Sequence, residues 1–447
     1  MKLRNLLFAG LAIATMASCS KDDDSNNGPK ADVDASLAFV VTSDELQTKA
    51  ETEDGSVKED FINKLDVYVF RGQDGTATLA NKKTVNAKNG VTVSQVDHIV
   101  VKVSPGNTLD EASTDQFTAY FLANCDDITA TTLSTFESAV AAKSVEDFTN
   151  DEQSSTYKYL PMAKKITFTG VKPLVNSDGL YVENWIQNNS TVKSADPVDK
   201  TAHEASVTAP SDNADVVVER LVARVQVEKI EVDLSAISSN ATFKLTHLAL
   251  ANVHTDVTPV GTTATTSVWA KGYQSENFVS KDTVIAPYSA DPYDEAVPSL
   301  VKSYTSSQAF NTGTYNFGTE TDALDQFVSY IYPNEGNDTF KFTLGSASLG
   351  TPNEKDATGY TLLLIAGDYK ATSASTAEKR HFRVKIDHDP STVVDYRVVA
   401  NYIYKLTVTI TGEGSGNEDD YQLNAHVAAT IDVAPWNVVE QNEDDAN

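Results

Sequence analysis

Residues 402–411 read Tyr-Ile-Tyr-Lys-Leu-Thr-Val-Thr-Ile-Thr, the cleanest strand pattern in the chain. Side chains of a strand point alternately to its two faces, so every second residue shares a face. The shared face is apolar here, with Tyr402, Tyr404, Leu406, Val408 and Ile410. The opposite face is mostly polar. The stretch therefore predicts a strand whose sheet covers a core with one side.

The same period of two recurs along the rest of the chain. It predicts further strands at 62–70, 90–103, 117–124, 164–169, 216–234, 243–251, 326–332, 339–344, 360–366, 380–386 and 427–433. The segment 128–148 is the best candidate for a few short helices, and the polar segment 186–214 is predicted to be a linker. Many short strands separated by turn signals favour an all-β protein of two tandem β-sandwich domains, residues 50–213 and 214–447.

Composition and charge agree with this class. The 447 residues include 18 Tyr and 17 Phe but only 3 Met, and Val and Thr are plentiful. The formal net charge is −28. Such a surface would repel nucleic acid and anionic lipid, so we expect no nucleic-acid partner. No stretch beyond the N-terminal segment is apolar enough to predict a membrane-spanning helix.

The N-terminus has the pattern of a secreted lipoprotein. Lys2 and Arg4 precede an apolar run, residues 6–16, that is too short to stay in a bilayer as a helix. Small residues then precede Cys19, whose thiol would accept the lipid and become the first residue after cleavage. The alternative is an ordinary signal peptide with an incidental cysteine. The acidic run 22–24 resembles the surface-export signal of Bacteroidetes lipoproteins.

We therefore predict a signal peptide over residues 1–18 and a propeptide over 19–49 that begins with a flexible polar tether. A lone apolar strand, 37–41, stands within the propeptide ahead of an acidic segment, 51–60. Cys125 is predicted to be a small buried residue, and lipidation of Cys19 would leave it without a disulfide partner.

No combination of residues in the sequence predicts catalysis. The seven histidines are scattered, and His247 and His254 only bracket a strand and its turn. Residues 387–390, Asp-His-Asp-Pro, could ligate a cation but better suit a tight turn. The glycines of the acidic loop 412–420 lack the lysine of a phosphate-binding loop, and its serine does not fit a nucleophile elbow. We expect no enzymatic activity, no metal site and no cofactor.

Several stretches together resemble the fimbrillins of Bacteroidales, the subunits of protease-assembled (type V) pili. They are NKLDVYVF at 63–70, FTAYFLAN at 117–124, LPM at 160–162, VERLVARV at 218–225, NYIYKLTVTITG at 401–412 and APWNVVEQN at 434–442. Each is weak alone, but in this order behind a lipoprotein signal they cover nearly all of the chain.

The resemblance implies two transthyretin-like sandwiches in tandem and a precursor that is a lipoprotein of the outer membrane. It also implies that a surface protease cuts after a basic residue and releases the lipid with the first strand. Lys49, before Ala50, is the best candidate, with Lys58 and Lys64 as alternatives. The family often has arginine here, so Lys49 requires a lysine-cutting or trypsin-like protease. The strand that leaves would carry Leu37, Phe39 and Val41.

A neighbour's extended segment can fill the groove that a lost strand leaves. The C-terminal segment, about 421–447, suits that role because its strands alternate and follow a flexible acidic loop. Its docking residues would be Val427, Ala429, Ile431 and Val433, with Trp436 or Val438. The alternative is that residues 427–439 form an edge strand of their own second domain, and part of the segment could serve both roles.

These inferences make the chain a structural stalk subunit of a surface fimbria that supports adhesion. Identical copies would polymerise by donor-strand exchange, and further partners would be accessory fimbrial subunits, the surface protease and host or bacterial receptors. The alternatives are a fimbrial tip or accessory adhesin without a free donor, an anchor subunit that keeps its lipid, and a surface glycan-binding lipoprotein that is never cut.

Overall fold

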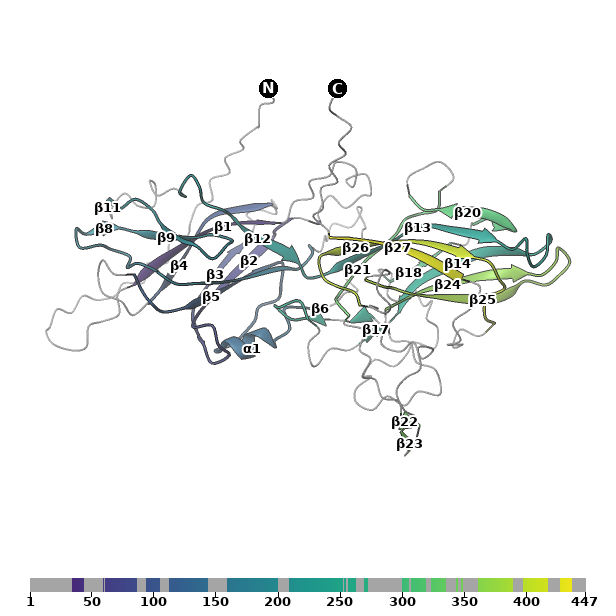
Figure 1. Ribbon diagram of the computed structural model, residues 1–447, viewed down its shortest axis with the longest axis horizontal. Coiled ribbons are helices and arrows are strands. Elements are labelled where there is room, and N and C mark those ends of the chain that lie inside the picture. The colour runs from purple at the N-terminus through teal and green to yellow at the C-terminus, as the bar shows by residue number, and fades with distance from the viewer. Residues whose placement is uncertain are drawn as a thin grey trace, which may run out of the picture.

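The computed structural model describes residues 34–43, 59, 61–86, 94–104, 112–143, 159–199, 209–251, 253–254, 256–262, 269–271, 300–304, 307–318, 323–334, 343–344, 347–348, 361–388, 397–416 and 427–435. Within them nearly every element is a strand, and the only helix, α1 (Leu133–Glu137), has five residues. Figure 1 shows two lobes arranged along the long axis of the molecule. The predicted all-β class is confirmed. None of the described helical segments is long and apolar enough to span a membrane.

The first lobe contains one nine-stranded sheet that folds over into two facing layers. In spatial order its strands are β10 (Val192–Ser194), β9 (Glu183–Ile186), β1 (Ala35–Ser43), β12 (Val216–Arg220), β7 (Met162–Phe168), β5 (Phe117–Ala123), β2 (Lys64–Arg71) and β3 (Thr78–Asn86), with β4 (Gln95–Val103) also beside β1. β12 joins the layers because it pairs in parallel with β1 and antiparallel with β7. Two short strands, β8 (Leu180–Tyr181) and β11 (Val198–Asp199), form a separate ribbon.

Alternate side chains of these strands fill the space between the two layers. Leu37, Phe39 and Val41 of β1 join apolar residues from β2, β4, β5, β7 and β12 in one buried cluster. The rings of Phe39 and Phe121 meet edge to face, with their centroids 5.0 Å apart. β1 therefore packs directly on β5 in the opposite layer.

The second lobe is a sandwich of two five-stranded sheets. One contains β20 (Thr312–Asn316), β13 (Ala223–Asp233), β26 (Tyr402–Ile410) and β27 (Val427–Pro435), with β21 (Phe327–Ile331) also on β13. The other contains β18 (Val301–Ser303), β14 (Thr242–Ala251), β24 (Leu362–Lys370) and β25 (Glu378–Lys385), with β19 (Ala309–Phe310) on β14. Two small ribbons pair β15 (Val253–His254) with β17 (Trp269–Lys271), and β22 (Thr343–Leu344) with β23 (Ala347–Ser348).

The apolar face predicted for residues 402–411 is the face that packs into the core of the second lobe. Tyr404, Leu406, Val408 and Ile410 are fully buried, and Tyr402 is half-buried at the start of β26. β26 lies between β13, its parallel neighbour, and β27, its antiparallel neighbour. The alternation in the sequence thus identified a central strand of the second lobe and the side that it buries.

The two lobes contact each other through strands and side chains. β6 (Ala142–Lys143) of the first lobe pairs with β16 (Asp256–Val257) of the second. A single buried apolar cluster runs from Phe136 of α1 and Tyr120 of β5 into the core of the second lobe. The two lobes therefore share a packed interface and are not joined by the connecting chain alone.

Two predictions about chain organisation are wrong. The stretch 216–234 is not one strand, because it breaks at Leu221–Val222 into β12, which pairs in the first lobe, and β13, which pairs in the second. The predicted linker 186–214 contains β10 and β11 and the last residue of β9. The two domain ranges stay a prediction, and the strand pairing favours a division near Leu221 over the one at 213/214.

Most other predicted strands are found within a few residues of their expected positions. The predicted strand 339–344 lies largely outside the described residues, and α1 falls inside the segment expected to form short helices. The prediction missed β3, whose residues are exposed or half-exposed on both faces. A strand without a buried face needs no apolar alternation, so the sequence gave no periodic signal for it.

We expect that Gly367→Ala lowers the free energy of unfolding by about 1–3 kcal/mol, because a Cβ at this point of β24 would overpack the sheet. That atom would lie 2.2 Å from Phe243 Cζ and 2.5 Å from the Lys244 carbonyl oxygen on β14. Gly416→Ala is the control, since its nearest obstacle is the flexible end of Arg380 at 3.3 Å. Urea unfolding measures both, and equal stability of the two variants would contradict the packing described for Gly367.

Candidate functional site

β1 is buried along most of its length, although it is the first strand of the described chain. Every residue from Ala35 to Val41 is at most 6% exposed. Leu37, Phe39 and Val41 point into the sandwich core, whereas Ala38 and Val40 belong to a second apolar cluster on the outer face. A strand with apolar side chains on both faces is typical of a sheet position where other parts of the protein cover both faces.

β1 is also paired along both of its edges. β4 runs antiparallel along one edge, from the Ala35–Val103 pair to the Thr42–Gln95 pair. The other edge is shared by two parallel strands: β9 pairs with residues 36–38 of β1, and β12 pairs with residues 41–43. Removal of β1 would therefore leave backbone donors and acceptors of three strands without partners.

Polar side chains hold the start of β1 in place. Asn184 Nδ2 donates a hydrogen bond to the Ser36 carbonyl oxygen at 2.9 Å, and Tyr181 Oη donates to Ser36 Oγ at 3.2 Å. Asn184 also bonds both backbone groups of Lys172. All of these partners belong to the region around β8 and β9. The start of β1 is therefore hydrogen-bonded to residues that are far from it in the sequence.

The chain downstream of β1 is anchored by a buried acid, Glu59, which is 2% exposed. Its Oε1 accepts a hydrogen bond from Tyr330 Oη of β21 and lies 3.5 Å from Arg224 Nη1 of β13. Its carbonyl oxygen accepts a hydrogen bond from Arg220 Nε of β12 at 3.1 Å. Glu59 thus ties the chain ahead of β2 to strands of both lobes, independently of β1.

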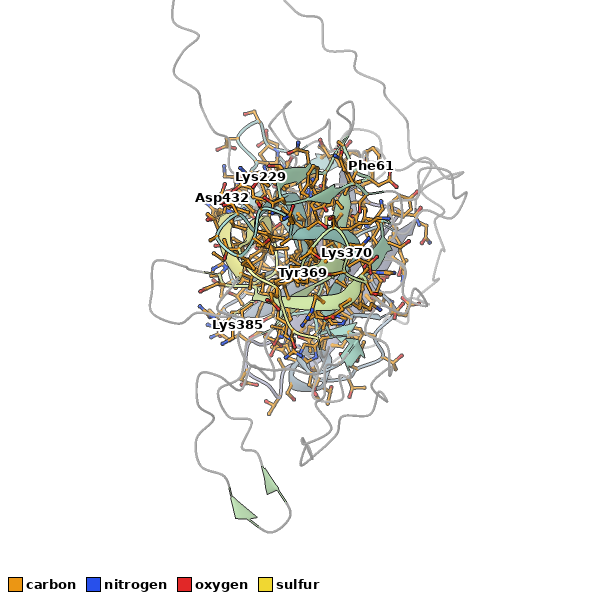
Figure 2. The ribbon with its side chains drawn as sticks, turned by 90° about the vertical axis from the view of Figure 1, so that its right-hand side faces the viewer. Phe61, Lys229, Tyr369, Lys370, Lys385 and Asp432 are labelled. Atoms are coloured by element: carbon orange, nitrogen blue, oxygen red, sulfur yellow. The ribbon has the colours of Figure 1, made fainter. Side chains whose placement is uncertain are left out.

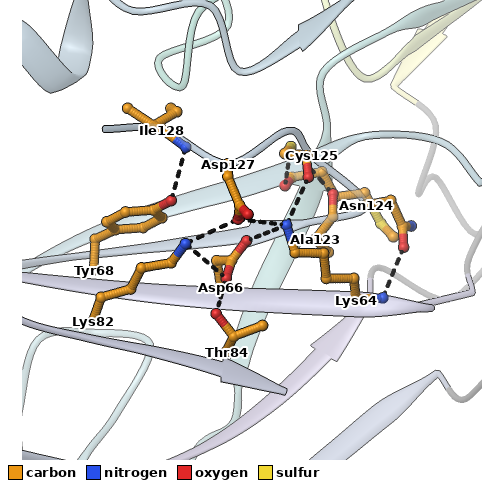
Figure 3. Close-up of polar contacts among 11 residues, drawn as sticks. Lys64, Asp66, Tyr68, Lys82, Thr84, Ala123, Asn124, Cys125, Asp127 and Ile128 are labelled. Carbon is orange, nitrogen blue, oxygen red and sulfur yellow. Dashed lines mark hydrogen bonds and ion pairs between the residues drawn. The ribbon is translucent and has the colours of Figure 1, made fainter. Parts of the chain in front are cut away.

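A second anchor follows at the start of β2 (Figure 3). Lys64 Nζ lies 2.8 Å from Asp66 Oδ2 and 2.7 Å from Asp127 Oδ1, and Lys82 Nζ lies 3.3 Å and 2.9 Å from carboxylate oxygens of the same two acids. Partial burial alone would lower the pKa of Lys64, but its hydrogen bonds with Asp127 and Asp66 raise it overall. Hydrogen bonds from Lys64 and Lys82 hold the pKa of Asp127 below its usual range.

Asn124 completes this anchor from the turn after β5. Its Oδ1 accepts a hydrogen bond from the Asn63 N–H at 2.8 Å, and its Nδ2 donates to the carbonyl oxygens of Phe61 and Leu160 at 2.8 Å and 2.9 Å. Asn124 has a φ of 56°, in the left-handed region that asparagine tolerates better than most residues. Glu59 and residues 61–64 are therefore held by contacts that do not involve β1.

The predicted donor residues lie on an edge strand of the second lobe. In the described part of the chain, β27 pairs with β26 alone, from the Ile410–Val427 pair to the Tyr402–Pro435 pair. Ile431 is 8% exposed, Val427 and Val433 are half-buried, and Ala429 is exposed. Asp432 of β27 lies at the outer edge of the lobe in Figure 2. The arrangement matches the edge-strand alternative, in which this segment covers its own domain.

Several predicted site residues cannot be located in the structure. Cys19, Lys49, Ala50, Trp436 and Val438 lie outside the described residues, as does Lys58. Lys64 is described, and its position in the ladder between β2 and β3 makes it a poor site for a protease. Their roles in lipidation, cleavage and donor docking stay predictions.

The remaining chemical candidates take structural positions. His388 Nδ1 lies 2.8 Å from Tyr404 Oη, and its ring packs against Tyr402. Among the described residues there is no group of three or more His, Cys, Asp or Glu side chains that could hold a metal ion. Cys125 is buried, and burial raises the pKa of its thiol, which suits the packing role that the sequence indicated.

Sequence reasoning missed the anchors and, of the three strands that pair with β1, it missed β9. Glu59 and Asn184 are isolated polar residues whose partners lie far away in the sequence, so no motif marks them. Asn124 ends the stretch FTAYFLAN at 117–124, but the sequence does not show which backbone groups it binds. Arg220 and Arg224 lie in the stretch VERLVARV at 218–225, one of those that carry the resemblance. Both side chains converge on Glu59.

The first lobe matches a known family model. Residues 35–210 match the model of the major fimbrial subunit protein (FimA), and the match begins at the first residue of β1. This family consists of fimbrial structural subunits and is not an enzyme family. The predicted resemblance to Bacteroidales fimbrillins is confirmed. No curated protein matches the sequence.

Solved structures share the fold over most of the chain. A fimbrilin (fimA) from Porphyromonas gingivalis W83 aligns with a TM-score of 0.51 and 16% identity, covering 92% of this chain and 99% of that one. A protein from Parabacteroides distasonis ATCC 8503, provisionally described as a cell adhesion protein, aligns with a TM-score of 0.51 and 17% identity, covering 91% and 100%. The arrangement of both lobes is thus that of known proteins.

We expect Phe39→Ala to lower the free energy of unfolding by about 3–5 kcal/mol, because it opens a cavity where β1 packs on β5. Phe39 is 0% exposed, whereas Ile237 is 40% exposed and supplies the control variant Ile237→Ala. Denaturant unfolding of the chain with β1 attached would show the difference. If the two variants were equally stable, β1 would not occupy the core.

We expect Glu59→Gln to lower the free energy of unfolding by about 3–5 kcal/mol, because it removes the buried negative charge that lies 3.5 Å from the buried Arg224 guanidinium. Glu413→Gln is the matched control. The side chain of Glu413 is 52% exposed and its oxygen lies as far as 3.9 Å from Arg380 Nη2, so the loss of this surface ion pair should change the stability little. Thermal and urea unfolding report the effect. An unchanged stability of Glu59→Gln would rule out the anchor between the lobes.

Proposed function

We propose that this chain is a structural subunit of a cell-surface fimbria, exported as a lipoprotein on Cys19, cut after Lys49 and joined to identical copies by strand exchange. The family match supports the coarser role of a fimbrial subunit that assembles with other subunits. One observation carries the finer proposal: β1 fills the middle of its sheet, while the chain beyond it is anchored without it.

The position of β1 makes its loss a large perturbation. The groove left behind would be lined by apolar side chains of the sandwich core and by the free edges of β4, β9 and β12. Exposed strand edges and apolar grooves are unfavourable in water and readily take up another strand. The anchors at Glu59, Lys64 and Asn124 would meanwhile keep β2 in place, so that cleavage opens a groove without unfolding the lobe.

β27 has the properties of the strand that fills this groove in a neighbour. It is nine residues long, as β1 is, and carries Val427, Ile431 and Val433 on one face. Among the described residues its one pairing partner is β26, so its release breaks a single described ladder. Residues 412–420, ahead of it, are rich in Gly, Asp and Glu, a composition typical of linkers. Within this range Ser415 is bound to His381 by two backbone hydrogen bonds, so the release of β27 would begin beyond Ser415.

Burial of apolar side chains would favour docking. Three large apolar side chains entering the groove would contribute roughly 5–9 kcal/mol at about 1.5–3 kcal/mol each, before ordering costs. The backbone ladders along both edges of the groove add to this. Because donor and groove are different surfaces, their contact does not close on itself and generates a filament.

The test is made on fimbriae sheared from the native cells. Unboiled material on a denaturing gel should give a heat-sensitive ladder, and the released monomer should begin at Ala50. A single lipidated species beginning at Cys19, with no ladder, would refute the proposal and favour an anchor or a glycan-binding lipoprotein.

We expect Lys49→Ala to leave full-length lipidated monomers, because β1 then stays in its groove. Lys58→Ala is the matched control and should be cleaved and polymerise as the unchanged chain does. Immunoblots of surface material before and after boiling report both variants. Normal ladders from Lys49→Ala would show that Lys49 is not the site that is cut.

A further inference from the structure

A contact between two strands passes over the outer face of β1. His98 belongs to β4, along one edge of β1, whereas Glu183 and Trp185 belong to β9, along the other edge. His98 Nε2 lies 2.9 Å from Glu183 Oε2 and 3.2 Å from Glu183 Oε1. The imidazole also stacks on the Trp185 indole, with centroids 5.2 Å apart and planes 19° from parallel. We refer to these three side chains as the clasp.

A bulge in β4 lets His98 reach across. The register between β1 and β4 shifts between Phe39 and Val41, so that Asp97 and His98 stand opposite the single residue Val40. His98 has a φ of 49°, in the left-handed region that is uncommon for residues other than glycine, although histidine enters it more often than most. Bulges of this kind redirect a side chain and recur next to functional sites.

The clasp is built from buried groups. The side chain of Glu183 is 1% exposed, and Trp185 is 1% exposed, whereas His98 keeps 24% of its side chain exposed. A buried carboxylate needs a partner of this kind, because burying an unpaired charge is costly. On the β9 side the clasp therefore consists of two buried side chains, Glu183 and Trp185. On the β4 side it consists of His98, which is more accessible to solvent.

The space beneath the clasp is small. On this face β1 presents Ala38 and Val40, which form one apolar cluster with Trp185 and Tyr181. In the register, Ala38 stands beside Trp185 and Ser36 stands beside Glu183. A large side chain at these positions would push the indole and the imidazole apart.

We propose that the clasp is the specificity element of the groove: it closes over the outer face of the resident strand and admits only a strand with small side chains beneath it. The occupant after β1 has left would be β27 of a second copy, so the inference rests on the strand exchange proposed above. The clasp would both slow the release of β1 and select the incoming strand by the face that points away from the core.

The outer face of β27 meets this requirement. The residues between its core-facing positions are Ala428, Thr430, Asp432 and Ala434, three of which are small. Ala428 and Thr430 are exposed in the free subunit, and the β26 ladder does not require them to be small. The proposal explains the small size of these two side chains, because they would have to fit beneath the clasp of a second copy.

Release of β1 tests the clasp without any polymer. In the purified chain, a protease site placed between Ser43 and Glu59 would be cut, and dissociation of the labelled N-terminal fragment followed by fluorescence anisotropy. We expect His98→Ala and Glu183→Gln to speed release about tenfold or more, as loss of a hydrogen bond to a charged group should. Lys102→Ala is the control, since Lys102 is exposed on the same strand. Unchanged release in both clasp variants would overturn the proposal.

Selection of the donor is tested in the assembled polymer. Ala428→Trp and Thr430→Trp should leave the subunit folded and cleaved, because both sites are exposed on β27, but at least one should reduce the ladder about tenfold or more. Combining that variant with His98→Ala should restore polymer, because the imidazole that would collide with the introduced tryptophan side chain is then absent.

The two proposals fail in different ways. If the unchanged chain forms no ladder, strand exchange is refuted, whatever the release rates. If the unchanged chain forms a ladder and both tryptophan variants form it equally well, strand exchange stands and the clasp has no role in selection.

Discussion

The pairing of β1 on both edges is the constraint on which the first lobe depends. A strand at the margin of a sheet could leave with the loss of one ladder, but β1 separates β4 from β9 and β12, so three strands lose partners together. The same strand supplies Phe39 to the core and Ala38 to the outer cluster. Its removal would therefore open the backbone ladder and both apolar faces in one event.

This dependence is balanced by contacts that do not involve β1. Glu59 bonds to Arg220 and Tyr330 and lies close to Arg224, and Asn124 holds the chain that leads into β2. β27 is in the opposite situation: within the described ranges it pairs with β26 alone, and several of its side chains are exposed. The described residues thus include a central strand paired along both edges and an edge strand paired along one, and the proposed strand exchange rests on these two features.

The sequence predicted strands where apolar residues recur at every second position. In β26 this alternation separates a buried face from a largely half-exposed one, whereas β5 and β2 are buried on both faces and were found from the same pattern. It failed for β3, which has no buried face, and for β10 and β11, whose short polar strands resemble a linker. It also read β12 and β13 as one strand, because a change of sheet at Leu221–Val222 does not interrupt an apolar pattern.

By itself the sequence determined the all-β class, the apolar first strand and the alternating C-terminal strand, since these follow from local composition and periodicity. The resemblance to a family also rested on sequence alone. Only the tertiary structure decided that β1 is central, that Glu59 is the anchor of the following chain, and that His98 meets Glu183 across β1. Such facts depend on which distant segments become neighbours, and single polar residues in a sequence carry no record of their partners.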